Sequence, residues 1–207
     1  MTWSSLNLWA KDEEPKIHSL IVEALTLLAN SKAVNSEDEE LTVSGKLRPI
    51  LYKVKKERDL VWTLQPEASS FEGITDPKPW GHPDFRLSGI TPEFDQYDYD
   101  IECKLVRVQR KGKNLDYCQH YVTDGIKRYQ VGKYAQSSPP MGTMIGYMQE
   151  GDIQTLLGVV DGIALRECST NIHVKGPIVL GGVTQMSQKL VRAVDSFILY
   201  HMWVDLR

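Results

Sequence analysis

The sequence has little of what an exported or membrane protein needs. Its three cysteines, Cys103, Cys118 and Cys168, form no CxxC pair and cannot all be joined in disulfides, which favours a reducing compartment and argues against a structural zinc site. No apolar run approaches the roughly 18 residues of a membrane-spanning helix, and the first residues lack the apolar segment of a signal peptide. We therefore expect a soluble, cytoplasmic protein with no membrane partner.

The chain also lacks zinc-type histidine spacing and an overall basic charge. Its five histidines form no HxxxH or HExxH motif, so zinc catalysis is not expected. The formal net charge is −3, which by itself argues mildly against a nucleic-acid ligand. However, eight basic and only two acidic residues lie between Lys104 and Lys133. This segment is either a solvated face or a surface for a polyanion, and charge alone slightly favours the solvated face.

The 207 residues have the composition of an ordinary globular domain, with 42% hydrophobic and 25% charged residues. Helical periodicity predicts helices over 15–34, 35–59, 114–129 and 151–168. The second begins with a capping-box pair at Ser36 and Glu39, and the third has an apolar stripe that includes Leu115. Short apolar or alternating runs predict strands over 60–64, 84–90, 99–108, 141–148, 171–182 and 196–206, with a loop over 66–83. This order predicts an α/β fold with a central mixed sheet flanked by helices.

The strand predicted over 99–108 carries an unusual group of charges. Because alternate residues of a strand face opposite ways, Asp100, Glu102 and Lys104 share one face, while apolar side chains share the other. Such a group is costly on a core strand unless each charge has a partner. Pairing within the group is one solution and a divalent metal is another. Asp100 is either a carboxylate that supports Glu102 from beside the site or a solvent-exposed residue near the start of the strand, and we expect the latter.

A second carboxylate is available on the preceding strand. Asp84 follows Pro83 at the start of that strand, and a hairpin-like pairing of the two strands would bring it close to Glu102. Magnesium is typically held by one or two carboxylates, water and substrate phosphate. There it polarises a phosphoryl oxygen and lowers the pKa of bound water. Lys104, about 7 Å along the same face from Glu102, can orient that water or stabilise charge on the phosphate.

The PD dipeptide at 83–84 and the ECK tripeptide at 102–104 resemble the PD-(D/E)xK nuclease superfamily, which has the restriction-endonuclease-like fold. The similarity covers roughly residues 37–148. It includes the segments YDIECKLV, YVTDGIKRYQVGKYA and MGTMIGYM, which look like bacterial anti-phage and restriction-type members. The downstream QxxxY pattern of one branch is absent. The blander interpretation is a satisfied salt bridge on an exposed strand and a turn aspartate after a proline.

The resemblance implies roles for individual residues. Asp84 and Glu102 correspond to metal ligands, with the backbone carbonyl of Cys103 as a third, and Lys104 corresponds to the catalytic lysine. The implied cofactor is Mg²⁺, for which Mn²⁺ can substitute. Basic residues near the expected site are candidates for phosphate contacts with nucleic acid: Arg107, Lys127, Arg128 and Lys133.

Many family members add a glutamate from the first core helix, and three glutamates here are candidates: Glu37, Glu39 and Glu40. Stepping back from Val43 at helical spacing places Glu40 on the core-facing side, so we select Glu40. An exposed acid that complements the helix dipole is an equal alternative for this residue. A capping role suits Glu39 better.

We thus expect an N-terminal helical arm over 1–35 and a nuclease-like domain over 36–207. The resemblance implies Mg²⁺-dependent hydrolysis of DNA in bacterial anti-phage defence or restriction. A homodimer or a partner defence protein is expected, because one site cuts one strand. Two alternatives stay open: a catalytically silent interaction subunit with this fold, and a ribonuclease that uses the same site.

Overall fold

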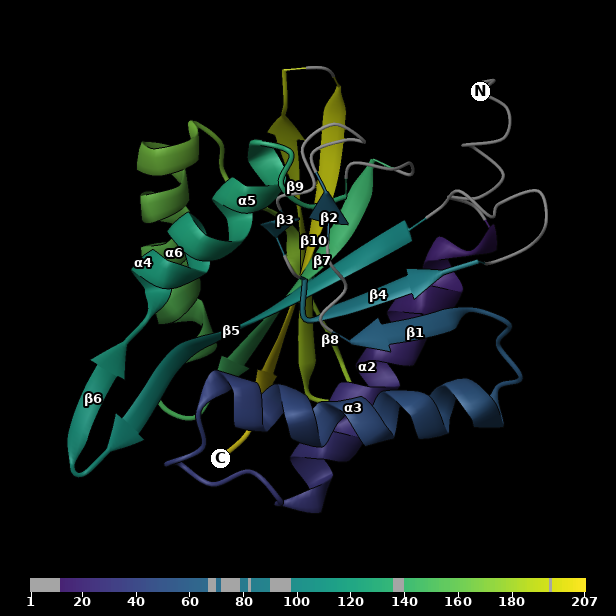
Figure 1. Ribbon diagram of the computed structural model, residues 1–207. Coiled ribbons are helices and arrows are strands. Elements are labelled where there is room, and N and C mark those ends of the chain that lie inside the picture. The colour runs from purple at the N-terminus through teal and green to yellow at the C-terminus, as the bar shows by residue number, and fades with distance from the viewer. Residues whose placement is uncertain are drawn as a thin grey trace.

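The computed structural model describes residues 12–66, 70–71, 79–81, 83–89, 98–135, 140–193 and 195–207. In this part of the chain the helices cover both faces of one mixed sheet, which confirms the predicted α/β class (Figure 1). The helical elements are α2 (Glu14–Ser31), α3 (Glu40–Glu57), α4 (Cys118–Tyr121), the π-helix η2 (Val122–Ile126), α5 (Lys127–Gln130) and α6 (Ile153–Cys168). None of the described helices is long and apolar enough to cross a membrane.

Eight described strands form the sheet, in the order β1-β4-β5-β7-β10-β9-β8, with β6 paired to β5 off this path. Strand β5 is parallel to β7 and β7 is parallel to β10, whereas the other pairs are antiparallel. The bounds are β1 Thr63–Pro66, β4 Phe85–Ser88, β5 Asp98–Arg110, β6 Lys113–Asp116, β7 Met141–Met148, β8 His173–Leu180, β9 Val183–Val191 and β10 Ser196–Asp205.

Two buried apolar clusters lie on the two faces of the sheet. The alternation of β7 shows this clearly, because Ile145 packs with α2 and α3, whereas its neighbour Met144 packs with α4, η2 and α6. Helix α2 begins near Pro15, as predicted, and lies against α3 and the sheet, so that it contributes to the first cluster. Residues 1–11 of the expected N-terminal arm lie outside the described residues.

The capping box predicted for α3 is wrong. The helix begins at Glu40, and its N-cap Glu39 makes no side-chain cap hydrogen bond. Ser36 instead lies in a turn whose geometry is set by Asp38, because the Asp38 carboxylate accepts a 2.7 Å hydrogen bond from the backbone N–H of Asn35. The acid that satisfies the local backbone is therefore Asp38, and the helix starts four residues after Ser36.

The helix predicted over 114–129 starts later than expected. Its first residues form β6 instead, so Leu115 pairs with Val108 of β5 and is not part of a helical stripe. Lys111 and Gly112 both have positive φ, 49° and 72°, which suits a two-residue hairpin turn between the strands. The hairpin of β5 and β6 extends from the body of the molecule in Figure 1.

Two further strand predictions need correction. The loop predicted over 66–83 contains a small antiparallel pair, β2 (Ser70–Phe71) with β3 (Pro79–Gly81). The C-terminal segment contains β9, which the sequence-based prediction omits. Gly181 and Gly182 both have positive φ and connect β8 directly to β9, so this glycine pair is a hairpin turn and not the end of the sheet.

Candidate active site

One edge of β5 lacks a strand partner in its middle. Strand β4 pairs with β5 only as far as Ile101, and β6 pairs with it only from Arg107 onward. Both use the edge opposite β7. Ile101 pairs with β4 on one side and β7 on the other, and Arg107 pairs with β6 on one side and β7 on the other. Within the described residues no strand covers the edge between these two positions. Pro83 explains where β4 stops, since proline has no N–H to continue the ladder.

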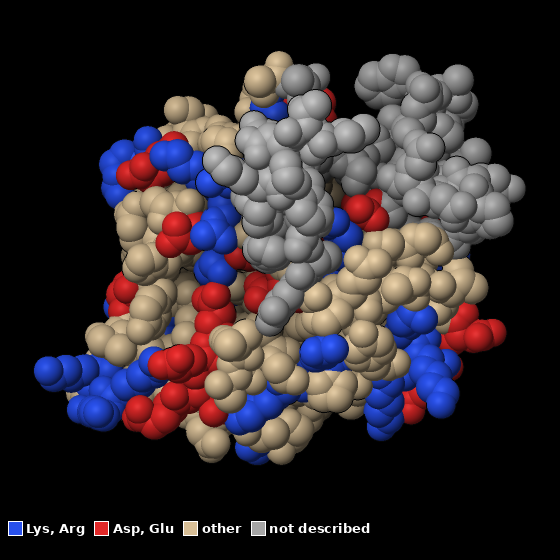
Figure 2. Space-filling model, viewed as in Figure 1, with Lys and Arg blue, Asp and Glu red and all other residues tan. Residues whose placement is uncertain are grey.

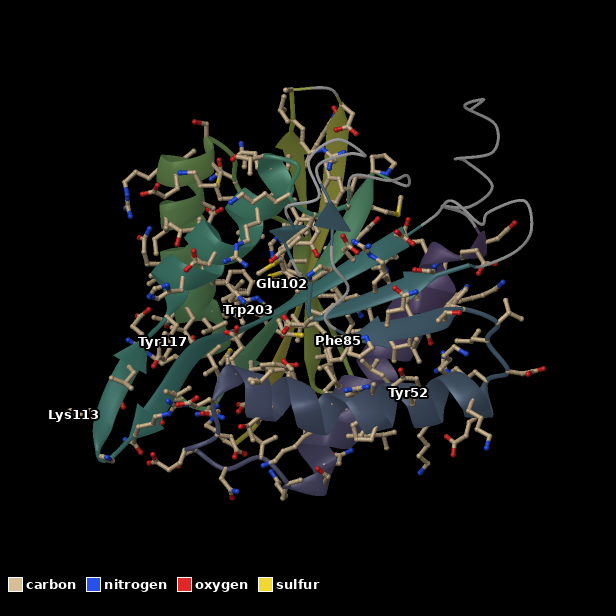
Figure 3. All side chains as sticks on the ribbon, in the orientation of Figure 1. Tyr52, Phe85, Glu102, Lys113, Tyr117 and Trp203 are labelled. Atoms are coloured by element: carbon tan, nitrogen blue, oxygen red, sulfur yellow. The ribbon has the colours of Figure 1, made fainter. Side chains whose placement is uncertain are left out.

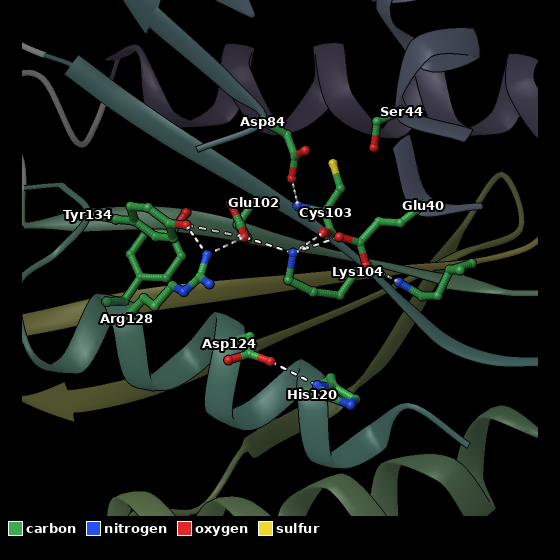
Figure 4. Close-up of polar contacts among 12 residues, drawn as sticks. Glu40, Ser44, Asp84, Glu102, Cys103, Lys104, His120, Asp124, Arg128 and Tyr134 are labelled. Atoms are coloured by element: carbon green, nitrogen blue, oxygen red, sulfur yellow. Dashed lines mark hydrogen bonds and ion pairs between the residues drawn. The ribbon is translucent and has the colours of Figure 1, made fainter. Parts of the chain in front are cut away.

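Two carboxylates cover the backbone amides in this gap (Figure 4). The Asp84 carboxylate accepts a 2.7 Å hydrogen bond from the N–H of Cys103. The Glu40 carboxylate accepts one of 3.1 Å from the N–H of Leu105. Asp84, directly before β4, and Glu40, the first residue of α3, thus lie on the same edge of β5 and satisfy amides that would otherwise be unpaired.

The ammonium group of Lys104 connects the acids. Its Nζ lies 2.7 Å from Glu40 Oε1 and 2.8 Å from Glu102 Oε1, and it donates a 3.0 Å hydrogen bond to the carbonyl of Cys103. Glu40, selected on helical spacing, is therefore brought into contact with Lys104. The alternative Glu37 instead accepts a 3.4 Å hydrogen bond from the N–H of Lys111.

Glu102 is the most deeply buried acid of this group, with 2% of the residue exposed. Figure 3 shows it in the middle of the molecule, between Phe85 and Tyr117. Burial is the main cause that raises the pKa of Glu102 to about 8, and the nearby Asp84 raises it further, while Lys104 lowers it only in part. Its Oε2 is buried and has no hydrogen-bond partner among the described residues. The carboxyl group therefore lies where an additional cation would stabilise its charged form.

The pKa of Lys104 is also raised, which for a lysine favours the charged form. Burial acts to lower its pKa, but the carboxylates of Glu102, Glu40 and Asp84 outweigh that effect, and the net shift is upward. The ammonium group therefore stays protonated at neutral pH. A charged donor of this kind can hold a water molecule or a phosphate oxygen, but it cannot accept a proton.

Two carboxylates and one carbonyl are available as metal ligands at the gap: Asp84, Glu102 and the backbone oxygen of Cys103. Continuing the β4–β5 register by one residue beyond the Phe85–Ile101 pair brings Asp84 opposite Glu102. These are hard oxygen donors, and the unpartnered Oε2 of Glu102 is free to serve, so the residues fit Mg²⁺ or Mn²⁺. The described residues contain no group of three or more His, Cys, Asp or Glu side chains arranged around a metal position.

The four predicted phosphate-contact residues separate in the structure. Arg128 lies at the site, with its Nη1 3.6 Å from Glu102 Oε1 and a 2.7 Å hydrogen bond to the hydroxyl of Tyr134. By contrast, Lys127 pairs with Glu167 of α6 at 3.7 Å, Arg107 pairs with Asp116 of β6 at 3.3 Å, and Lys133 is exposed beyond α5. Of these four described residues, Arg128 alone has an ion pair with Glu102.

The expectation that Asp100 ends in solvent is wrong. The residue is fully buried, and its carboxylate accepts hydrogen bonds of 2.6 and 3.1 Å from the guanidinium of Arg86 on β4. It also accepts a 2.7 Å hydrogen bond from the N–H of Ala135. Strand β5 begins earlier than predicted, at Asp98, so that Asp100 lies under the segment that follows α5. Asp100 therefore positions Tyr134, whose hydroxyl donates to Glu102 at 3.3 Å.

A pocket of about 410 Å³ opens beside Lys104. Three residues from α4, η2 and α5 form one side of it: His120, Asp124 and Arg128. They are spaced by four along the sequence, so a polar stripe accompanies the apolar stripe that predicts this helical segment, and it is the signal that could have identified them. Figure 2 shows acidic and basic side chains next to each other on this face of the molecule.

Gly125 allows η2 to lie close to the sheet. A Cβ at this position would be 2.3 Å from Cε of Met144 on β7 and 3.8 Å from Cγ of Lys104. The π-helical turn and the absence of a side chain therefore set how closely the polar stripe approaches Lys104. Single π-turns of this type are frequent at functional sites.

Comparison of the chain with protein-family models, with curated proteins and with solved structures gave no match.

Proposed function

We propose that the chain is a metal-dependent nuclease of the PD-(D/E)xK type that hydrolyses DNA phosphodiester bonds in bacterial anti-phage defence or restriction. One observation carries this proposal. Asp84 and Glu102 lie at the same stretch of β5, and the buried Oε2 of Glu102 has no partner in the described part of the chain. Two neighbouring acids each make it harder for the other to ionise. A divalent cation between them, next to the ammonium group, would stabilise both in their charged forms.

The order of the elements supports the proposal. Helix α3 supplies Glu40, the start of β4 supplies Asp84 and β5 supplies Glu102 and Lys104, in the order that the family resemblance implies. A helical segment and the parallel strand β7 follow. This is the element order expected of a restriction-endonuclease-like fold.

In this mechanism the carboxylates of Asp84 and Glu102 and the carbonyl of Cys103 would hold Mg²⁺, for which Mn²⁺ can substitute. When bound, such an ion supplies Lewis-acid polarisation of the phosphate and a lowered pKa of water. Lys104 orients the attacking water and stabilises negative charge on the phosphate, because its raised pKa keeps it protonated. Glu40 fixes the position of Lys104 through the 2.7 Å ion pair.

Arg128 is the residue best placed to contact a neighbouring phosphate, since 38% of its side chain is exposed while its Nη1 remains 3.6 Å from Glu102. The chain would act in the cytoplasm as a homodimer or with a partner defence protein, because one such site cuts one strand.

A cleavage assay tests the proposal. Purified chain is incubated with plasmid DNA, single-stranded DNA and RNA, each with Mg²⁺, Mn²⁺ or EDTA. We expect metal-dependent cutting of DNA, and losses of about a hundredfold or more for Lys104→Met and Glu102→Gln. Glu57→Gln, at an exposed position on the last turn of α3, is the matched acid control and should cut normally. Cutting that is equal in all variants would overturn the proposal.

A second readout does not depend on activity. Mn²⁺ should raise the melting temperature of the wild-type chain, because a ligand that binds only the folded state stabilises it. Asp84→Asn and Glu102→Gln should reduce this increase, while Glu57→Gln should keep it. Absence of both cutting and a Mn²⁺ effect would favour the interaction subunit, and cutting of RNA alone would favour the ribonuclease.

A further inference from the structure

The pocket beside Lys104 has a role that the proposed metal site does not explain. Its lining includes Lys104 and Glu40 but not Asp84 or Glu102, so it adjoins the acids without containing the proposed ligands. Its volume of about 410 Å³ is within the range of small-ligand pockets. It has room for one nucleotide but not for a stacked duplex.

Two of the acids that line the pocket are already engaged by the protein. Glu40 accepts hydrogen bonds from Lys104 and from the N–H of Leu105. Asp124 pairs with the Nδ1 of His120 at 2.8 Å, as the dashed line in Figure 4 shows. The third acid of the lining, Glu39, is exposed. None of the ion pairs among the described residues joins these acids to Arg110 or Arg128.

The guanidinium groups of Arg110 and Arg128 retain donor capacity. Arg110 donates from Nη2 to the carbonyl of Asp38 at 2.8 Å, while its Nε is buried and has no hydrogen-bond partner within the described residues. Arg128 uses Nη1 for the hydroxyl of Tyr134. A guanidinium has five N–H donors, so both residues can still bind an anion, and the planar guanidinium matches a pair of oxygens of a tetrahedral phosphate.

An aromatic wall accompanies these cations. The rings of Tyr117 and His120 both line the pocket, with centroids 6.2 Å apart and planes tilted by 47°. Asp124 fixes the ring of His120 through its Nδ1. Any nucleobase can stack on an aromatic side chain, because every base has a π-face. A phosphate and a base are thus the two parts of one ligand that the pocket can recognise.

We propose that this pocket is a nucleotide subsite, which takes one unpaired nucleotide of the substrate strand next to the phosphate that is cut. Arg110 and Arg128 contact its phosphate, and Tyr117 stacks on its base. The inference rests on the proposed nuclease function and narrows its substrate to strands that are single or locally unpaired beside the cut.

The test measures binding in the absence of metal. Thymidine 3′,5′-bisphosphate is titrated by calorimetry into the full chain in EDTA at low salt. We expect Arg110→Gln and Tyr117→Leu each to weaken binding by about tenfold, and Tyr117→Phe to stay within about twofold of the wild type. Arg48→Gln, an exposed arginine of α3 outside the pocket, is the matched control and should not change binding.

Tyr117 packs partly against the α2–α3 core, so each variant is first checked by thermal unfolding. Arg110→Gln keeps the test decisive if Tyr117→Leu does not fold. Binding that is undetectable in the wild type, or equal in wild type and Arg110→Gln, would overturn the subsite.

The failure of either proposal can be recognised separately. A chain that binds the bisphosphate through Arg110 but never cuts would retain the subsite and lose the nuclease function. A chain that cuts duplex and single-stranded DNA equally well, with no effect of Arg110→Gln, would retain the nuclease function and lose the subsite. We expect single-stranded DNA to be cut faster than duplex, and Arg110→Gln to reduce that preference.

Discussion

The carboxylate of Asp84 is bonded to the backbone N–H of Cys103 at 2.7 Å. Cys103 lies between Glu102 and Lys104, so the acid that precedes β4 is fixed relative to the other two groups by main chain and not by side-chain packing alone. Binding sites built on strands are held more firmly than sites built on loops. The relative positions of the three residues are therefore set mainly by the pairing of β4 with β5.

The first prediction concerns the pH dependence of stability. The pKa of Glu102 is raised from 4.5 in an ordinary environment to about 8 in the folded chain. Between these values the folded chain holds a proton that the unfolded chain has lost, so the free energy of unfolding falls as pH rises, by up to about 1.4 kcal/mol per pH unit. Glu102→Gln should flatten this slope. Urea unfolding between pH 6.5 and 8 measures it.

The measured range starts at pH 6.5 because two buried histidines change the free energy of unfolding below that pH. Burial lowers the pKa of His18 to about 4 and that of His201 to about 3. Their protonation in the unfolded state makes stability fall as pH drops below 6.5, which is the opposite sign. Equal slopes for the wild type and Glu102→Gln above pH 6.5 would show that Glu102 is ionised in the folded chain at neutral pH.

A second prediction concerns Lys104, whose positive charge compensates the buried carboxylate of Glu102. Lys104→Met leaves Glu102 buried without its cation, so the variant should lose about 3–5 kcal/mol at pH 8 and less at pH 5, where Glu102 is protonated. Adding Glu102→Gln should recover part of the loss at pH 8. Lys53→Met removes an exposed partner of Glu57 and should change stability by less than about 0.5 kcal/mol. A loss that is the same at both pH values would contradict the prediction.

The third prediction uses two helical glycines as a matched pair. Gly125→Ala places a methyl group against Met144, so we expect a loss of about 1–3 kcal/mol and a disturbed approach of η2 to Lys104. Gly158→Ala lies on the exposed side of α6 with nothing within 4 Å of the new Cβ, and should stabilise the chain by about 0.5–1 kcal/mol. Thermal unfolding compares the two. Destabilisation by both would point to a general effect of helical alanine.

Features with strict local periodicity could be predicted from the sequence. The alternation of β5 places Glu102 and Lys104 on one face, and the structure has them there, 2.8 Å apart at their charged atoms. Helical spacing also selects Glu40, and the structure places this glutamate in contact with Lys104. In both cases the direction in which a side chain points follows from the local periodicity of its own helix or strand.

What the sequence did not reveal depends on contacts between distant segments. The burial of Asp100 requires Arg86 from β4 and Ala135 from the segment after α5, neither of which is close to it in sequence. The pocket likewise joins Arg110 from the end of β5 to the polar stripe that begins at His120. Periodicity within one helix or strand contains no information about contacts between segments that are distant in the sequence.

The part of the β5 edge that no described strand covers also bears on strand pairing. Exposed strand edges invite a strand from another molecule, and proteins commonly block them with charge. Asp84 and Glu40 occupy the N–H groups of Cys103 and Leu105 and place negative charge where an incoming strand would dock. Replacing either acid would therefore leave a main-chain N–H of β5 available to an incoming strand, as well as altering the proposed site.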